Sequence, residues 1–452
     1  MSAPESLHVV NLAPAQVGIC PGIQNSSPDV VKVANRLLQK NHDEFHIFWR
    51  DFAGHNHTAH NVLTRLALGA DETDLENGFV DNKTDQRPRP PVDEQVVREL
   101  GTDGGFYKLL GEVNHYTNFL VFFEREIDQK GWREVIQEYC FGRTRNSDTL
   151  LARLFEGAFH PIIHLGLGVE FEQPSIIAEA LSQAASDHAF GADPFMRNAE
   201  ARALQIPDGT ESRLLVDLIH EVRINEKTRT AARWDDFQWK MKNGVLGRGM
   251  EDIAALAAQY RVKPDTLERQ TAEMISCCSY FAGAAQKPGK ARKIDFFYMH
   301  DVTSSIFNTV FNRQSWIRVE DKVRLLEHKA RFDLVWYATC GAPELHIEDI
   351  ENFTTGASAD WGWDEMFRVS KGLRDDGHVA KFVRAVKNGE EVSKEFEDET
   401  FPVKGDMWLK LAHMAYETTV GLPDDEKWLP FVGFDQPWGR VPDLKEHQAL
   451  SD

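Results

Sequence analysis

Apolar residues recur at intervals of three and four along most of this chain, the spacing of helices that bury one face. In residues 61–70, for example, Leu63, Leu66, Ala67 and Ala70 share one side of a helix. Alternating apolar and polar positions, which would indicate strands, are nearly absent. The same pattern predicts further helices at residues 30–38, 119–127, 149–155, 175–185, 267–284, 296–311, 323–339, 379–386 and 408–416. The predicted fold class is therefore mostly α.

Three stretches rich in polar residues, proline or charge interrupt this pattern, at residues 71–94, 286–292 and 393–402. They are predicted to be surface loops rather than domain linkers. No repeat of 20–50 residues is visible, which argues against a solenoid. We therefore expect residues 1–452 to form a single large multi-helix domain.

The charge of the chain narrows the class of its partners. With 51 basic and 71 acidic residues the formal net charge is −20, which disfavours nucleic acid and anionic membranes. The chain shows neither a basic-then-apolar leader nor an apolar run of about 18 residues, so we expect a soluble, cytoplasmic protein. Its 28 Phe and 11 Trp residues suit a large flat pocket for a small molecule. The sequence does not indicate an oligomeric state.

Five cysteines are scattered along the chain without a CxxC pair. This number and spacing indicate neither a disulfide framework nor a thiolate zinc site. The cysteines are therefore predicted to be free and buried.

Three short clusters place nitrogen-bearing side chains three or four residues apart. They are His57 with His60, His160 with His164, and His378 with Lys381. Such spacing aims two side chains of a helix at one point, as metal sites between helices require. Each pair is equally compatible with hydrogen-bonded core histidines. The sequence leaves both interpretations open.

Lys381 raises a separate question, because an ammonium group cannot ligate a metal. It is either a surface lysine or a lysine carboxylated by carbon dioxide, whose carbamate oxygen would be an anionic ligand. Pro161 either starts a helix or kinks one. Gly166 and Gly168 either allow close approach of another backbone or end that helix.

The remaining motifs are weaker or absent. His42 and His46 have helical spacing but lie among charged residues, so a solvated helix is predicted there. His300 follows an aromatic run and is compatible with a core, supporting or ligand role. No GxGxxG motif after a strand and no Walker A loop occur, so a nucleotide site for NADPH is not visible. Histidine-bound iron is the redox cofactor most compatible with these residues.

Several segments resemble, in family order, those of the questin oxidase-like family of fungal and bacterial aromatic-polyketide enzymes. They are residues 55–60 running into 66–70, then 157–166, 299–305, 377–381 and 431–435. One departure is His115, where a tyrosine is expected, and this would alter contacts with the substrate. The resemblance implies oxygen-dependent cleavage of a fused aromatic or quinone ring, such as an anthraquinone, in secondary metabolism.

The resemblance also implies a cofactor, an Fe(II) ion held by four imidazoles and a carboxylated lysine, with O2 as co-substrate. The implied ligands are His57, His160, His164, His378 and Lys381. His60 would be a hydrogen-bonding or acid–base neighbour, although helical projection leaves the choice between His57 and His60 as ligand close. His300 is the candidate for taking a phenolic proton. Two alternatives are a metal-free, NADPH-dependent Baeyer–Villiger oxidase and a non-catalytic helical ligand carrier.

Overall fold

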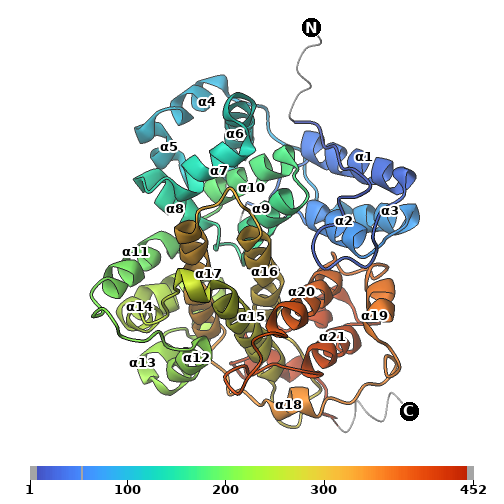
Figure 1. Ribbon diagram of the computed structural model, residues 1–452, viewed down its shortest axis with the longest axis vertical. Helices are drawn as coiled ribbons and strands as arrows, with labels where there is room; N and C mark the ends of the chain where they lie inside the picture. Colours follow the sequence, from blue (N-terminus) through green and yellow to red (C-terminus); the bar gives the residue numbers. More distant parts are fainter. Residues whose placement is uncertain (1–7, 52–53, 445–452) are drawn as a thin grey trace. The chain divides into compact units, whose positions relative to one another are not determined.

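Helices make up the secondary structure of the computed structural model, which describes residues 8–51 and 54–444 (Figure 1). Within these ranges, β pairing is limited to isolated bridges, such as the one between Phe45 and Pro88. The prediction of a mostly α fold is confirmed.

Contacts between Cα atoms divide the chain into two compact units. The first comprises residues 1–189, 310–318 and 367–384, and the second comprises the remainder. Neither unit is continuous in sequence, and three helices contribute residues to both: α16 (Phe296–Asn312), α19 (Trp363–Ser370) and α20 (His378–Ser393). The expectation of one domain over residues 1–452 stays a prediction.

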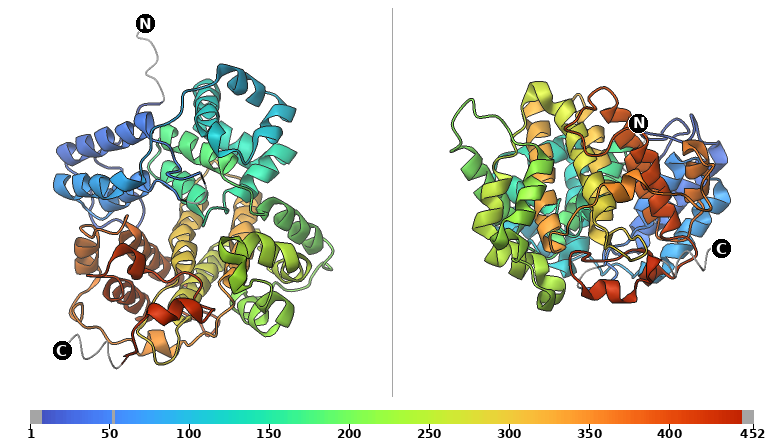
Figure 2. Two further views of the ribbon diagram at one scale, coloured as in Figure 1. Left: turned by 180° about the vertical axis from the view of Figure 1, so that it is seen from behind. Right: turned by 90° about the horizontal axis from the view of Figure 1, so that it is seen from below.

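The first unit contains the helices of the N-terminal part of the chain. These are α1 (Pro28–Glu44), α2 (Thr58–Ala67), α3 (Glu72–Asp81), η1 (Asn82–Asp85), α4 (Glu94–Leu100), α5 (Asp103–Leu109), η2 (Val113–His115), α6 (Tyr116–Lys130), α7 (Trp132–Phe141), α8 (Arg145–Arg153), α9 (His160–Glu170) and α10 (Pro174–Ser186). Helix α10 packs against α6 and α9, while α1, α2 and α3 lie side by side (Figures 1 and 2). Helix α2 also packs against α9, so all ten of its residues are buried.

One predicted loop of this unit contains a helix. Residues 71–94 are rich in charge, yet α3 occupies residues 72–81. Asp71 caps this helix by accepting a hydrogen bond from the Asp74 N–H at 2.8 Å, and the Asp74 side chain accepts one from the Asp71 N–H. Leu75 is fully buried, and packing against α1 and α2 together with this capping box holds the helix. The loop prediction was wrong here because it weighed only composition.

The second unit contains the remaining helices. These are α11 (Ala192–Ala203), α12 (Leu215–Ile224), α13 (Glu226–Arg229), η3 (Trp234–Trp239), η4 (Lys240–Arg248), α14 (Met250–Ala257), η5 (Pro264–Thr266), α15 (Leu267–Ala284), α17 (Val319–Thr339), α18 (Glu348–Glu351), α21 (Met407–Glu417), α22 (Asp424–Lys427) and η6 (Gln436–Arg440), with parts of α16, α19 and α20. Helix α17 packs against α12, α14 and α15. The five cysteines, in both units, are buried and form no disulfide among the described residues, as predicted.

Among the described helices, none combines the length and the apolar character needed to cross a bilayer.

Candidate functional site

The backbone before α9 determines where His160 lies. Gly157, Ala158 and Phe159 all adopt left-handed conformations, with φ of 56°, 52° and 63°. Helix α9 then begins at His160, and Pro161 is in its first turn, where a missing N–H costs little. Of the two alternatives for Pro161, the structure therefore has the helix start and not the kink.

Two glycines around this helix are needed for close approach. A Cβ at Gly157 would lie 2.4 Å from Asp187 Oδ2, and a Cβ at Gly168 would lie 3.0 Å from the Ile177 backbone nitrogen. Helix α9 continues to Glu170, so Gly168 serves the packing of α10 rather than the end of α9. Close packing of α9 against α10 places Glu179 of α10 beside His164.

His160 is the centre of one group of imidazoles in the first unit. Its Nε2 lies 2.8 Å from His57 Nε2, and its Nδ1 donates to the Gly157 carbonyl oxygen at 2.6 Å. His55 stacks on the His160 ring at 4.1 Å between centroids, and His55 Nε2 lies 3.1 Å from Asp187 Oδ2. Because Nδ1 of His160 carries the proton, its Nε2 is the lone-pair nitrogen.

His164 belongs to a second, adjoining group. Its Nδ1 lies 3.1 Å from His60 Nε2, and its Nε2 lies 2.7 Å from Glu179 Oε2. The other Glu179 oxygen, Oε1, lies 2.7 Å from His42 Nδ1, and His42 Nε2 lies 2.9 Å from Glu124 Oε1. An unbroken chain of hydrogen bonds thus runs from His60 to Glu124.

His42 corrects a prediction, because it is buried rather than solvated. Burial alone would lower its pKa, but the hydrogen bonds to Glu124 and Glu179 outweigh this and raise the pKa to about 9. Burial likewise would raise the pKa of Glu179, but the hydrogen bonds from His164 and His42 lower it to about 2. His42 and Glu179 therefore form a buried ion pair. His46 is also buried, and burial together with Arg87 lowers its pKa to about 3.

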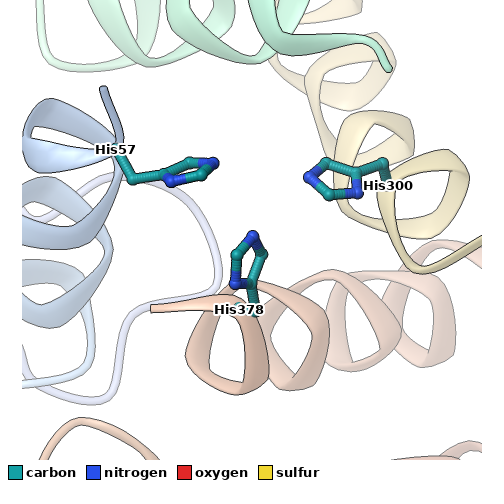
Figure 3. A group of neighbouring side chains, drawn as sticks. All are labelled: His57, His300 and His378. Carbon is teal, nitrogen blue, oxygen red and sulfur yellow. The ribbon is translucent and has the colours of Figure 1, made fainter. Parts of the chain in front are cut away.

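His378 and Lys381 lie in the first turn of α20, which begins directly after Gly377. Gly377 has φ of 74°, and a Cβ there would lie 2.8 Å from Asn61 Oδ1 of α2. This close approach brings the His378 ring to 4.8 Å from the His57 ring, centroid to centroid. The His378 Nδ1 donates to the Asp375 carbonyl oxygen at 2.9 Å, which leaves Nε2 as the lone-pair nitrogen. Figure 3 draws His57 and His378 together with His300.

Lys381 is buried, and among the described residues no hydrogen-bond partner for its Nζ is found. Burial lowers its pKa to about 8, against a smaller opposing effect of Asp375 and Asp376. A surface lysine, one of the two interpretations from the sequence, is therefore ruled out. At pH 7.5 roughly a quarter of such amines are neutral, compared with about 0.1% for an ordinary lysine.

These contacts define which side chains of the first unit could bind a metal ion. His160 and His378 each donate from Nδ1 to a backbone carbonyl, an arrangement that typically orients metal-ligating histidines. Two nitrogens bound to one ion at right angles lie roughly 3.0 Å apart, close to the His57–His160 separation. Ligand atoms of His57 and His378 lie within 4.8 Å of each other, and among the described first-unit residues no third candidate ligand joins both at that separation.

His300, predicted from the sequence as an acid–base residue, belongs to α16 in the second unit. It is buried, and its Nδ1 donates to the Phe296 carbonyl oxygen at 2.7 Å. His115, the departure from the family pattern, is half-buried, and its Nδ1 lies 3.2 Å from Asn118 Nδ2.

Glu179 was not identified from the sequence, and His55 was placed in the 55–60 segment without a role of its own. Glu179 is a single acid within the apolar run Ile176–Ala180, a pattern that indicates a buried carboxylate with a partner. That signal could have identified Glu179, whereas His55 carries no such signal because its neighbours are polar.

Comparison with known proteins gives a consistent family. The model of the questin oxidase-like family matches residues 54–386. The chain is 50% identical over 439 residues to Baeyer-Villiger oxidase ptaJ of Pestalotiopsis fici, covering 96% of this chain and 98% of that protein. It is 50% identical over 441 residues to Baeyer-Villiger monooxygenase dmxR6 of a Cryptosporiopsis species, covering 96% and 98%. It is 47% identical over 441 residues to a questin oxidase of Aspergillus terreus, covering 97% and 98%. The chain therefore belongs to the questin oxidase-like family.

Proposed function

We propose that this protein is an oxidoreductase that cleaves a fused aromatic or quinone ring, of the anthraquinone type, by inserting oxygen next to a carbonyl. The proposal is supported by relatives named as questin oxidase and as Baeyer–Villiger oxidases. We further propose that it uses Fe(II). The observation that carries this second part is the buried imidazole group of the first unit with a buried lysine one turn from His378.

The residues fit such an ion. His57, His160 and His378 would hold it, because the His57 ring contacts each of the other two rings and hydrogen bonds to carbonyls orient those two. Bound iron would supply the electron-rich centre that O2 requires, and imidazole ligands suit it. All three side chains are less than a tenth exposed, so the protein excludes bulk water from them.

Lys381 would contribute an oxygen ligand after reaction with carbon dioxide. The neutral amine attacks the carbon atom, an N–C bond forms, one proton leaves, and an anionic carbamate results. The carbamate removes the cost of burying an unpaired ammonium group, and a nearby cation would stabilise its negative charge.

For His164 we propose a role that differs from the ligand role implied by the resemblance. Among the described residues, its hydrogen bonds and ring contacts are with His60 and Glu179, and not with His57, His160 or His378. We therefore place His164 behind His60 and assign to His60 the uptake of a phenolic proton from the substrate. An imidazole suits this step because its ordinary pKa lies near neutral pH. His300 keeps the acid–base role predicted from its sequence as an alternative.

The test combines metal analysis with an anaerobic assay on a hydroxylated anthraquinone. We expect ring opening that requires both O2 and iron, with loss of iron and of at least 100-fold in rate in His160→Ala. His220→Ala removes an exposed histidine and serves as the matched control. Full turnover by metal-stripped protein would overturn the iron proposal.

A second candidate is a metal-free oxidase that takes electrons from NADPH. The observation in its favour is that one relative is named a monooxygenase, a class that needs two electrons for each O2. NADPH consumption equal to product formation in iron-free protein would establish this candidate in place of the first.

A further inference from the structure

Glu179 is a buried carboxylate that contacts two histidines. It is 3% exposed, in the middle of α10. Its Oε2 faces His164 Nε2 and its Oε1 faces His42 Nδ1, both at 2.7 Å. An ionised carboxylate can only accept hydrogen bonds, so both of these ring nitrogens carry protons.

The positions of these protons determine the direction of the hydrogen bond between His164 and His60. Because a neutral imidazole has one N–H, protonation of His164 at Nε2 makes its Nδ1 an acceptor. The His60 Nε2 at 3.1 Å must then donate to that nitrogen. The basic nitrogen of neutral His60 is consequently Nδ1.

His42 keeps this direction fixed. Its Nδ1 donates to Glu179 and its Nε2, at 2.9 Å, donates to Glu124, so both ring nitrogens are protonated. A buried imidazolium beside Glu179 favours the ionised carboxylate over the protonated acid. A protonated Glu179 would donate a hydrogen bond to His164 and so reverse the direction of the hydrogen bonds between Glu179, His164 and His60.

We propose that Glu179 is a positioning residue that sets the tautomers of His164 and His60, with the proton of each of these two histidines on Nε2. Only the expected effect on turnover rests on the proposed function, in which His60 takes up a proton from the substrate.

Glu179→Gln is the sharpest test because it keeps the shape of the side chain. His42 Nδ1–H will bind the amide oxygen, so the amide NH2 faces His164 Nε2, which must become an acceptor. His164 then donates from Nδ1, His60 accepts at Nε2, and the proton of His60 moves to Nδ1. The variant thereby converts the basic nitrogen of His60 into a donor.

The measurement is 15N nuclear magnetic resonance of metal-free protein labelled at histidine, in which the two tautomers have distinct nitrogen shifts. His60→Asn and His164→Asn identify the two signals. We expect Nε2–H tautomers for both residues in the natural protein and Nδ1–H tautomers in Glu179→Gln. Glu124→Gln, which leaves the Glu179 carboxylate in place, should retain the natural tautomers.

A natural protein with its His60 proton on Nδ1 overturns the inference, and this result needs no variant to fold. Unchanged tautomers in Glu179→Gln also overturn it. In turnover, we expect kcat to fall at least tenfold in Glu179→Gln and to recover partly in Glu179→Asp, with KM little changed. Since the resonance measurement uses neither iron nor substrate, it can succeed or fail independently of the proposed function.

Discussion

Lys329 in the second unit and Lys381 in the first are both buried, at 1% and 5% exposure, yet they have opposite electrostatic surroundings. The Lys329 ammonium contacts the Asp333 carboxylate one turn along α17. Burial alone would lower the pKa of Lys329, but Asp333 outweighs it and raises the pKa. No such carboxylate contacts Lys381 Nζ among the described residues, and burial lowers its pKa to about 8.

The difference separates a structural buried cation from a reactive one. Lys329 remains charged beside two buried acids, Asp333 and Asp301. Burial and Asp333 raise the pKa of Asp301. Lys381 has a substantial neutral fraction at physiological pH and is therefore a nucleophilic amine. Burial without a partner is what makes a lysine available for chemistry.

The largest expected effect is on stability. Lys329→Met should lower the free energy of unfolding by about 3–5 kcal/mol, because it leaves a buried carboxylate unpaired. Lys381→Met, in metal-free protein, should change it by less than about 1 kcal/mol, because no ion pair is lost. Urea unfolding at pH 7 measures both. Equal losses in the two variants would contradict the distinction.

His42 extends the comparison to a third buried cation, one that is paired as Lys329 is. Its pKa is raised from 6.5 to about 9, so the folded protein binds the extra proton more tightly than the unfolded chain. This stabilisation is fully present below pH 6.5 and is lost as the pH rises through 9. Between pH 7 and 9 the loss should be about 2 kcal/mol.

The measurement is urea unfolding of the natural protein and of His42→Gln at pH 7 and pH 9. The difference between their pH dependences isolates the His42 contribution. The same dependence in both proteins would show that His42 is not a stabilising cation.

A smaller effect is expected on metal affinity. Lys381→Met should weaken iron binding at least tenfold, roughly 1.4 kcal/mol, because the carbamate oxygen is lost. Millimolar formate should restore part of the affinity by supplying a carboxylate in the vacated space. Iron affinity that is unchanged in Lys381→Met would remove Lys381 from the ligand set.

The smallest signal is the carbamate itself. Protein supplied with 13C-labelled bicarbonate at pH 8 should show a carbamate carbon resonance that is absent in Lys381→Met and present in Lys32→Met, which alters an exposed lysine. The resonance should weaken below pH 7, where the amine is protonated. A spectrum without this resonance in the natural protein loaded with diamagnetic Zn(II), in place of the paramagnetic iron that would broaden the signal, would contradict carboxylation.

Local sequence signals account for several of the helix starts. Pro28, Pro161 and Pro174 stand in the first turns of α1, α9 and α10, and Gly377 directly precedes α20. These residues act through their own backbone preferences, so the sequence around them is sufficient. The histidine pairs at helical spacing were identified for the same reason.

Long-range contacts explain what the sequence did not predict. His42 lies among charged neighbours in α1, but Glu179 and Glu124, more than 80 residues away in sequence, bury and protonate it. The direction of the chain through His164 likewise depends on a carboxylate of another helix. The charges of neighbouring residues in the sequence therefore gave a wrong prediction for His42, because its partners are distant in sequence.

The left-handed run at residues 157–159 limits how this protein can be re-engineered. Two of its three residues carry side chains in a conformation that such residues rarely adopt, and a Cβ at Gly157 would overlap Asp187 Oδ2. A mutant library aimed at new substrates should therefore hold this tripeptide constant and diversify elsewhere. Substitutions there would displace His160 and would be scored as loss of function whatever the new substrate.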